Sequence, residues 1–383
     1  GRGQPAAAAR VITSGPLTGG REFSMADPAE LYTGVGKAPP QPFTWLKLLP
    51  PVIFTLAVAE LYFWHLHGVA SVVLFICAAI AHVEANRPKP HVLNIVGTAR
   101  IIKHMHDRLT DPAEQMESVI SLLDLTRSAA SRRVETLEEI VRERGLHAVC
   151  EALVQHPKTS SFVVPAYQLL YRVVLAPESR KDAIAVFNED SLMGSLLEPM
   201  RAWMAAARTA TKEKPPEPTL LVRGLMVVGA LADSNTDMQD GAAELDVPEA
   251  IVSVLETTAK WEAVHDELAP SALRCLFHVC YQHDECKSAL IVRADGVRRL
   301  VRTLTLAPSQ MEAQLHGLGV LYDCMQHVPG VDMQWLRHHA VDAGVIPVLK
   351  SAIETFPKVQ TIVDTASQLK ELLEKVAKEP VEL

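Results

Sequence analysis

Residues 344–353 read GVIPVLKSAI, and four earlier stretches of the chain have the same character. In each, a small or acidic residue comes first and apolar side chains follow at helical spacing: GLHAVCEALV (145–154), SLMGSLLEPM (191–200), DVPEAIVSVL (246–255) and GVRRLVRTL (296–304). The starts of the five stretches lie 46, 55, 50 and 48 residues apart. Apolar spacing of this kind indicates helices, and recurrence at this period indicates stacked helical units that share one core.

A second helix, rich in Ala, Gly and Leu, is predicted after each of these stretches. The five sequences are PAYQLLYRVV (165–174), RGLMVVGALA (223–232), SALRCLFHVC (271–280), LHGLGVLYDC (315–324) and TASQLKELLE (365–374). The longest interval contains RTATKEKPPEP (208–218), whose prolines and charges indicate a loop insertion. No strand-and-turn pattern follows residue 110, so we predict an all-α repeat domain over residues 111–378 and a short tail over residues 379–383.

The repeat resembles the armadillo family. The phrase AGVIPVL (343–349) and the A-x-x-L helix after it look like the second and third helices of that repeat, and the resemblance covers roughly residues 131–376. HEAT-like or generic α-solenoid packing stays open, because the unit spacing is longer than usual. The resemblance implies a surface that binds proteins rather than a catalytic site. The asparagine ladder with which armadillo carriers grip extended peptides is not visible, since the third-helix positions read Tyr171, Ala232, His278 and Asp323.

A long apolar run, LLPPVIFTLAVAELYFWHLHGVASVVLFICAAIA, occupies residues 48–81. Within it begins a stretch of 23 residues, 61–83, that contains no Asp, Glu, Lys or Arg. A helix needs about 20 apolar residues to cross the hydrocarbon core of a bilayer. We therefore predict a single transmembrane helix over residues 48–83, followed by the armadillo-like α-solenoid, as the fold class.

One face of this predicted helix is polar. Glu60, Trp64, His67 and Ser71 recur at steps of four, three and four residues, which places them on the same side of a helix. Polar and ionisable groups in membrane helices usually face protein, so we expect this face to contact neighbouring subunits or lipid. A proton path through Glu60 and His65 or His67 is the alternative, although one helix cannot build a relay by itself.

The segment over residues 84–110 is basic. Residues 85–106 contain no acid but carry Arg87, Lys89, Arg100 and Lys103. Apolar residues at helical spacing predict an amphipathic surface helix within this segment. We expect the four basic side chains to contact anionic lipid such as cardiolipin, and the charge bias to place the C-terminal domain on the matrix side.

The first 47 residues have the composition of an organelle-targeting leader. No acidic residue precedes Glu22, and Arg, Ala, Gly and Ser/Thr are frequent. We expect residues 1–47 to form an extended tail that lies along partner proteins, and we expect the protein to reside at the mitochondrial inner membrane. Plain disorder of the tail is the alternative, since such a composition cannot bury a core.

Neither the net charge nor the motifs of the sequence indicate nucleic-acid binding, metal binding or catalysis. A net charge of −8 gives no basic footprint for nucleic acid. The six cysteines show no paired framework, which is typical of a reducing compartment. The densest potential metal site comprises Cys275, His278, Cys280, His283 and Cys286, but it lacks a C-x2-C knuckle, so we interpret it as core packing. We find no H-E-x-x-H, G-x-S-x-G or Gly-rich phosphate loop, and we expect no catalytic residue, metal, cofactor or small-molecule substrate.

These observations predict a non-catalytic structural or accessory subunit of a large mitochondrial inner-membrane complex that makes its contacts through the helical repeat. The ATP synthase is our first expectation, and a respiratory-chain complex is the alternative. A free membrane-anchored adaptor that recruits soluble clients is a second alternative.

Overall fold

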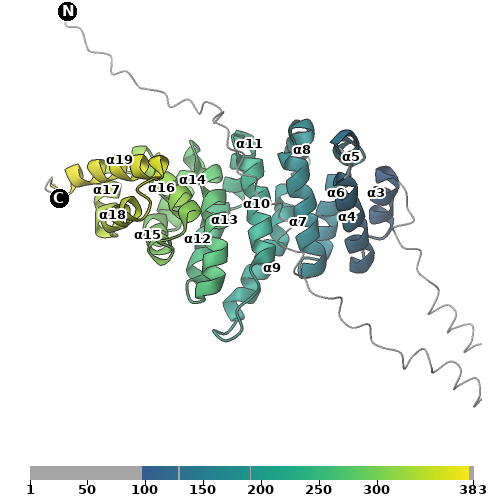
Figure 1. The fold of residues 1–383 in the computed structure, drawn as a ribbon, viewed down its shortest axis with the longest axis horizontal. Helices are drawn as coiled ribbons and strands as arrows, with labels where there is room; N and C mark the ends of the chain where they lie inside the picture. Colours follow the sequence, from purple (N-terminus) through teal and green to yellow (C-terminus); the bar gives the residue numbers. More distant parts are fainter. Residues whose placement is uncertain (1–96, 128–129, 190, 379–383) are drawn as a thin grey trace, which may run out of the picture. The chain divides into compact units, whose positions relative to one another are not determined.

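The computed structural model describes residues 97–127, 130–189 and 191–378 (Figure 1). Within these ranges the chain forms seventeen α-helices, α3 to α19, one short π-helical turn, η3, and no strand. All of these helices belong to one compact unit, Pro88–Leu383. The all-α prediction is therefore confirmed for the described part of the chain.

The described helices are arranged as five successive three-helix units after α3 (Thr98–Asp107) and α4 (Pro112–Thr126). The first helices are α5 (Ala130–Arg142), α8 (Pro177–Glu189), α11 (Thr236–Glu244), α14 (Asp284–Ser288, continued by η3, Ala289–Arg293) and α17 (Met333–Asp342). The second helices are α6 (Gly145–Gln155), α9 (Met193–Thr209), α12 (Val247–Thr258), α15 (Gly296–Leu306) and α18 (Val345–Thr355). The third helices are α7 (Ser160–Leu175), α10 (Thr219–Ala232), α13 (Glu262–Cys280), α16 (Met311–Gln326) and α19 (Gln360–Val376).

Helices of the same rank stack on one another from unit to unit (Figure 1). The third helices pack in the order α7, α10, α13, α16 and α19, with α4 before them. The second helices pack in the order α6, α9, α12, α15 and α18, with α3 before them. Each unit thus buries its apolar side chains against its neighbours, as a solenoid does. The fold is all-helical and α-solenoid-like.

A backbone feature recurs at the junction between the first and second helix of each unit. One residue there adopts the left-handed conformation: Arg144, Ser191, Asp246, Asp295 and Gly344, with φ of 60°, 52°, 55°, 48° and 88°. This conformation is uncommon for residues other than glycine, and it allows the chain to turn sharply at the end of a helix. The five sequence stretches that begin at residues 145, 191, 246, 296 and 344 start within one residue of these turns.

Buried glutamines satisfy the carbonyl groups at the ends of helices. Gln115 of α4 donates from Nε2 to the backbone oxygen of Met105 at 2.7 Å, at the end of α3. Gln314 of α16 donates in the same way to Leu304 at 2.8 Å, near the end of α15. The last carbonyls of a helix have no partner within the helix, so these amides stabilise helix ends that water does not reach.

The stack begins earlier than the predicted repeat domain. Helix α3 packs against α4, α5 and α6 and buries Ile101, Ile102 and Met105. The apolar face of the predicted amphipathic helix is therefore covered by protein in the structure. Arg100 and Lys103 lie on its exposed side.

The predicted fold class needs a correction. No helix in the described residues combines the length and apolar character needed to cross a membrane. The segment over residues 48–83, to which the transmembrane helix was assigned, lies outside the described residues. The fold class is accordingly an all-α, solenoid-like stack, and the single transmembrane helix is not retained.

Candidate functional site

Small side chains on α10 open a hollow in the row of third helices. Gly229 and Ala230 lie near the end of α10, where α7 packs on one side and α13 on the other. A Cβ atom on Gly229 would lie 3.2 Å from the Cα atom of Cys275, so the two helices approach closely there. Tyr171 of α7 and His278 of α13 line the space beside these small residues. We call this space the α10 hollow.

The α10 hollow measures about 50 Å³. The residues that line it are Tyr171, Leu175, Leu225, Met226, Gly229, Ala230, Asp233, Ser271, Arg274, Cys275 and His278. Pockets that enclose drug-sized ligands or cofactors are larger, at roughly 300–1,000 Å³. The hollow therefore has room for one side chain of a bound chain rather than for a cofactor.

The carboxylate in the hollow is already paired. Asp233 follows α10 and lies 3.4 Å from Nη2 of Arg180 and 3.2 Å from Nδ1 of His278. Arg180 also donates to the backbone oxygens of Ala230 and Asp233, at 3.2 and 3.1 Å. This network holds the end of α10 against α8 and α13, because charge-assisted hydrogen bonds are the stronger ones.

The guanidinium of Arg274 is not paired. Within the described ranges it makes no ion pair within 4.0 Å and no hydrogen bond, although its residue is half-buried. Its charge acts on two nearby imidazoles: burial and then Arg274 lower the pKa of His316 to about 4. Burial also lowers the pKa of His278, which the Asp233 carboxylate opposes. At neutral pH both rings are uncharged, and Arg274 is the unpaired cation of the hollow.

Aromatic rings continue the same face onto α16. The centroid of the Phe277 ring lies 5.7 Å from that of His316 and 5.2 Å from that of Tyr281. The Phe277 ring also covers Gly319, where an added Cβ atom would come within 2.8 Å of Cε2. Aromatic rings are frequent where proteins bind other proteins.

Acidification should lower the free energy of unfolding through His316. Its pKa is about 4 in the folded chain and near 6.5 in the unfolded chain, so between these values the unfolded state binds more protons. The contribution of His316 to the free energy of unfolding is then fully present above about pH 6.5, and it is lost as the pH falls towards 4. Replacing His316 by Gln should flatten the dependence of the urea midpoint on pH in this window. If the urea midpoint of the Gln variant depended on pH as strongly as that of the wild type, the lowered pKa of His316 would be contradicted.

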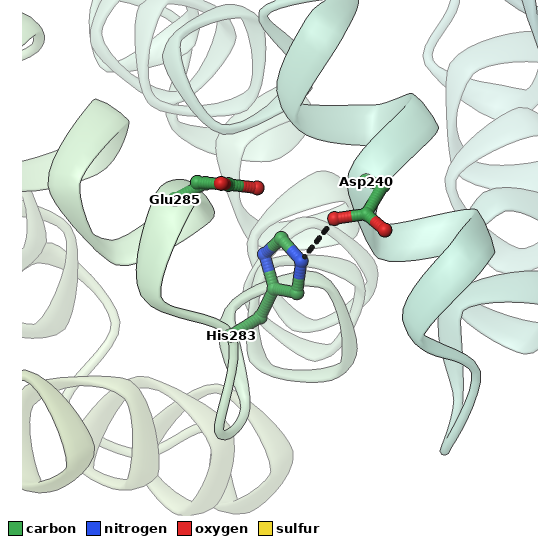
Figure 2. A group of neighbouring side chains, drawn as sticks. All are labelled: Asp240, His283 and Glu285. Atoms are coloured by element: carbon green, nitrogen blue, oxygen red, sulfur yellow. Dashed lines mark hydrogen bonds and ion pairs between the residues drawn. The ribbon is translucent and has the colours of Figure 1, made fainter.

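A second cluster lies between α11 and α14 (Figure 2). Potential ligand atoms of Asp240, His283 and Glu285 all lie within 4.8 Å of one another. Figure 2 shows the Asp240 carboxylate facing the His283 ring from α11, with the Glu285 carboxylate on the other side. Sequence reasoning missed Asp240 and Glu285, because no metal-binding spacing links them to His283.

Hydrogen bonds of His283 favour a structural role for this cluster. Its Nδ1 atom accepts from the backbone N–H of Cys286 at 3.3 Å and caps the start of α14. The ring proton is then on Nε2, which donates to Oδ1 of Asp240 at 2.9 Å. A metal at Nε2 would require the proton to move to Nδ1, where it would face another N–H group. The arrangement instead ties α14 to α11 of the preceding unit.

Two solved structures of engineered proteins, both from the Northeast Structural Genomics Consortium, are similar to this fold. The first has a TM-score of 0.54 and 18% identity, and the match covers 73% of this chain and 97% of that protein. The second has a TM-score of 0.54 and 15% identity, with 73% and 98% coverage. At this identity the likeness shows the fold alone. No protein-family model matches the chain, and no curated protein matches it either.

The third-helix positions noted from the sequence have different environments. Tyr171 and His278 line the α10 hollow, and Ala232 is buried. Asp323 of α16 accepts from the backbone N–H of Gln282 at 3.1 Å, which fixes the left-handed turn after α13. Burial raises the pKa of this carboxyl group.

The three cysteines of the potential metal site are buried thiols on two neighbouring helices. Cys275 and Cys280 lie in α13, whereas Cys286 lies in α14 and donates to the backbone oxygen of Gln239. Burial raises the pKa of all three thiols, to about 12 for Cys286. Thiols of this kind are unreactive, because the thiolate is the nucleophile and the metal ligand.

The remaining predicted site residues lie mostly outside the described residues. These are Glu60, Trp64, His67 and Ser71 of the polar face, and Arg87 and Lys89 of the basic segment. Arg100 and Lys103 are exposed on α3, and their contact with anionic lipid stays a prediction.

Proposed function

We propose that this chain is a non-catalytic, armadillo-like scaffold whose third helices bind an extended segment of a partner protein. Three-helix units support the armadillo assignment over HEAT repeats, whose units have two helices. The left-handed residue between the first and second helix of every unit supports a common origin for the five units. Stacked repeats of this kind serve as extended binding surfaces.

The observation that carries the proposal is the α10 hollow. It lies on the row of third helices, takes side chains from α7, α10 and α13, and has the volume of one side chain. The rings of Phe277, Tyr281 and His316 extend the same face across α13 and α16. A bound chain that crosses these helices could place one side chain in the hollow and pack the next against the rings.

We propose the setting of this interaction from the sequence alone. We keep the proposal that the partner is another subunit of a large assembly, with the mitochondrial ATP synthase first and a respiratory-chain complex as the alternative. A free adaptor that recruits soluble clients is the other candidate. Migration on a native gel after mild detergent extraction distinguishes a subunit from a free adaptor, because only a subunit migrates with the assembly.

Site-specific photo-crosslinking tests the binding face. Met226 lines the hollow, whereas Ala185 is exposed on α8 and does not line it. With p-benzoylphenylalanine at position 226, we expect one discrete crosslinked product in the cells that express the protein. The same probe at position 185 is the matched control and should not give this product. Equal crosslinking from both positions, or none from position 226, would contradict the proposal.

A further inference from the structure

We infer that the α10 hollow binds an acidic side chain, an aspartate or glutamate carried by the extended partner segment, through the guanidinium of Arg274. This inference rests on the proposed function and adds the chemistry of the partner. It follows from the charges that line the hollow, the pairing of those charges and the size of the space.

The guanidinium of Arg274 is not paired with a carboxylate of the described residues. Arg274 is half-buried and makes no ion pair there. The nearby carboxylate, Asp233, is held by Arg180 and His278 instead. A guanidinium presents a planar fork of donors that matches a carboxylate, and a partly desolvated pair is stronger than one in water.

The other groups in and beside the hollow select against competing ligands. His278, which lines the hollow, and His316, whose ring centroid lies 6.3 Å from that of His278, are uncharged at neutral pH, so they do not attract a multiply charged polyanion. The protein as a whole has a net charge of −8, which also disfavours nucleic acid. Leu225 and Met226 supply apolar surface beside Arg274, which suits the methylene groups of an acidic side chain. A single carboxylate on a peptide therefore fits the hollow better than a phosphate chain.

Selection from a phage-displayed library of random short peptides tests this inference on the full chain. Peptides selected by the wild-type protein should share Asp or Glu at one fixed position. Peptides selected by the Arg274→Glu variant should lose this preference and gain Lys or Arg at that position. Arg274→Gln should lose the acidic preference without gaining a basic one. The matched control is Arg298→Glu, an exposed arginine on α15, which should select the wild-type pattern.

Exchanging the charges of the peptide and of residue 274 allows the contribution of this contact to the affinity to be measured. Replacing the selected acidic residue by Lys should weaken binding to the wild-type protein by about tenfold or more, and the same peptide should bind better to Arg274→Glu. Circular dichroism on each variant confirms that the helices are intact.

The possible failures are distinguishable. Peptides that bind through Met226 but show no acidic preference would overturn this inference and leave the proposed function standing. Failure to select any peptide, or selected peptides whose binding is unaffected by Met226→Asp, would overturn both.

Discussion

A Leu273→Asp substitution should prevent the helical stack from folding stably. Leu273 is completely buried on α13 and lies against Gly317 of α16, the next third helix. An aspartate there would place a carboxylate among apolar side chains with no partner, which costs several kcal/mol. Whole domains are stable by only about 5–15 kcal/mol. Urea denaturation followed by circular dichroism should show a large loss of the free energy of unfolding, or no folded baseline at all.

Two further variants make this result specific. Leu318→Asp changes another completely buried leucine, on α16, and should have a similar effect. Leu306→Asp changes a leucine on α15 that is 45% exposed and should alter stability by no more than about 0.5 kcal/mol. If Leu273→Asp gave a soluble, helical protein with the wild-type urea midpoint, the assignment of α13 to the core would be wrong.

The position of α13 explains why one substitution should have so large an effect. This helix packs against α10 on one side and α16 on the other, so it belongs to two interfaces between units. In a repeat protein, stability is the sum of the units and of the interfaces between neighbours. A charge at Leu273 weakens a unit and the contact with α16 at the same time.

The second and third helices were predictable because their apolar periodicity is strong. Stretches such as GVIPVLKSAI and SALRCLFHVC carry enough buried positions to show the helical period. The first helices were not recognised individually. Helix α11 reads TDMQDGAAE and α14 reads DECKS, and such short polar segments contain too few apolar residues to define a period. Their positions are set by contacts with neighbouring units rather than by their own pattern.

The apolar face of α3 illustrates a limit of sequence patterns. The spacing of its apolar residues correctly indicates an amphipathic helix, but amphipathicity does not identify what covers the face. A lipid surface and a neighbouring helix both satisfy it. In the structure, Ile101, Ile102 and Met105 pack against protein.

The α10 hollow could not be predicted, because it depends on what side chains leave empty. Gly229 and Ala230 have no chemical signature, and their neighbours Tyr171 and Arg274 come from other units. The Asp240–His283 contact likewise joins residues 43 positions apart. The position of a third-helix residue can be read from the repeat, which is why Tyr171 and His278 were noted. Whether the charge of a residue such as Arg274 is paired can be seen only in the three-dimensional structure.

A Gly296→Ala substitution should destabilise the protein, whereas Gly194→Ala should not. Gly296 begins α15 directly after the left-handed Asp295, and an added Cβ atom would lie 2.6 Å from the backbone oxygen of Leu290 and 2.5 Å from its Cδ1 atom. Because a backbone oxygen cannot move away as a flexible side chain can, the turn itself must shift. Overpacking of this kind costs about 1–3 kcal/mol.

Gly194 provides the control because it lies in the first turn of α9 and an added Cβ atom would meet nothing within 4 Å. Alanine has the higher helix propensity, so Gly194→Ala should leave stability unchanged or raise it by up to about 1 kcal/mol. Urea midpoints of the two variants, measured with an unchanged m-value, give the comparison. Equal shifts for both would show that loss of glycine, rather than the close approach at Leu290, determines the effect. Opposite shifts would establish that the turn between the first and second helix requires glycine at position 296 for its packing. The corresponding turn of the first unit has the same close approach, because a Cβ atom on Gly145 would lie 2.8 Å from the backbone oxygen of Ile140.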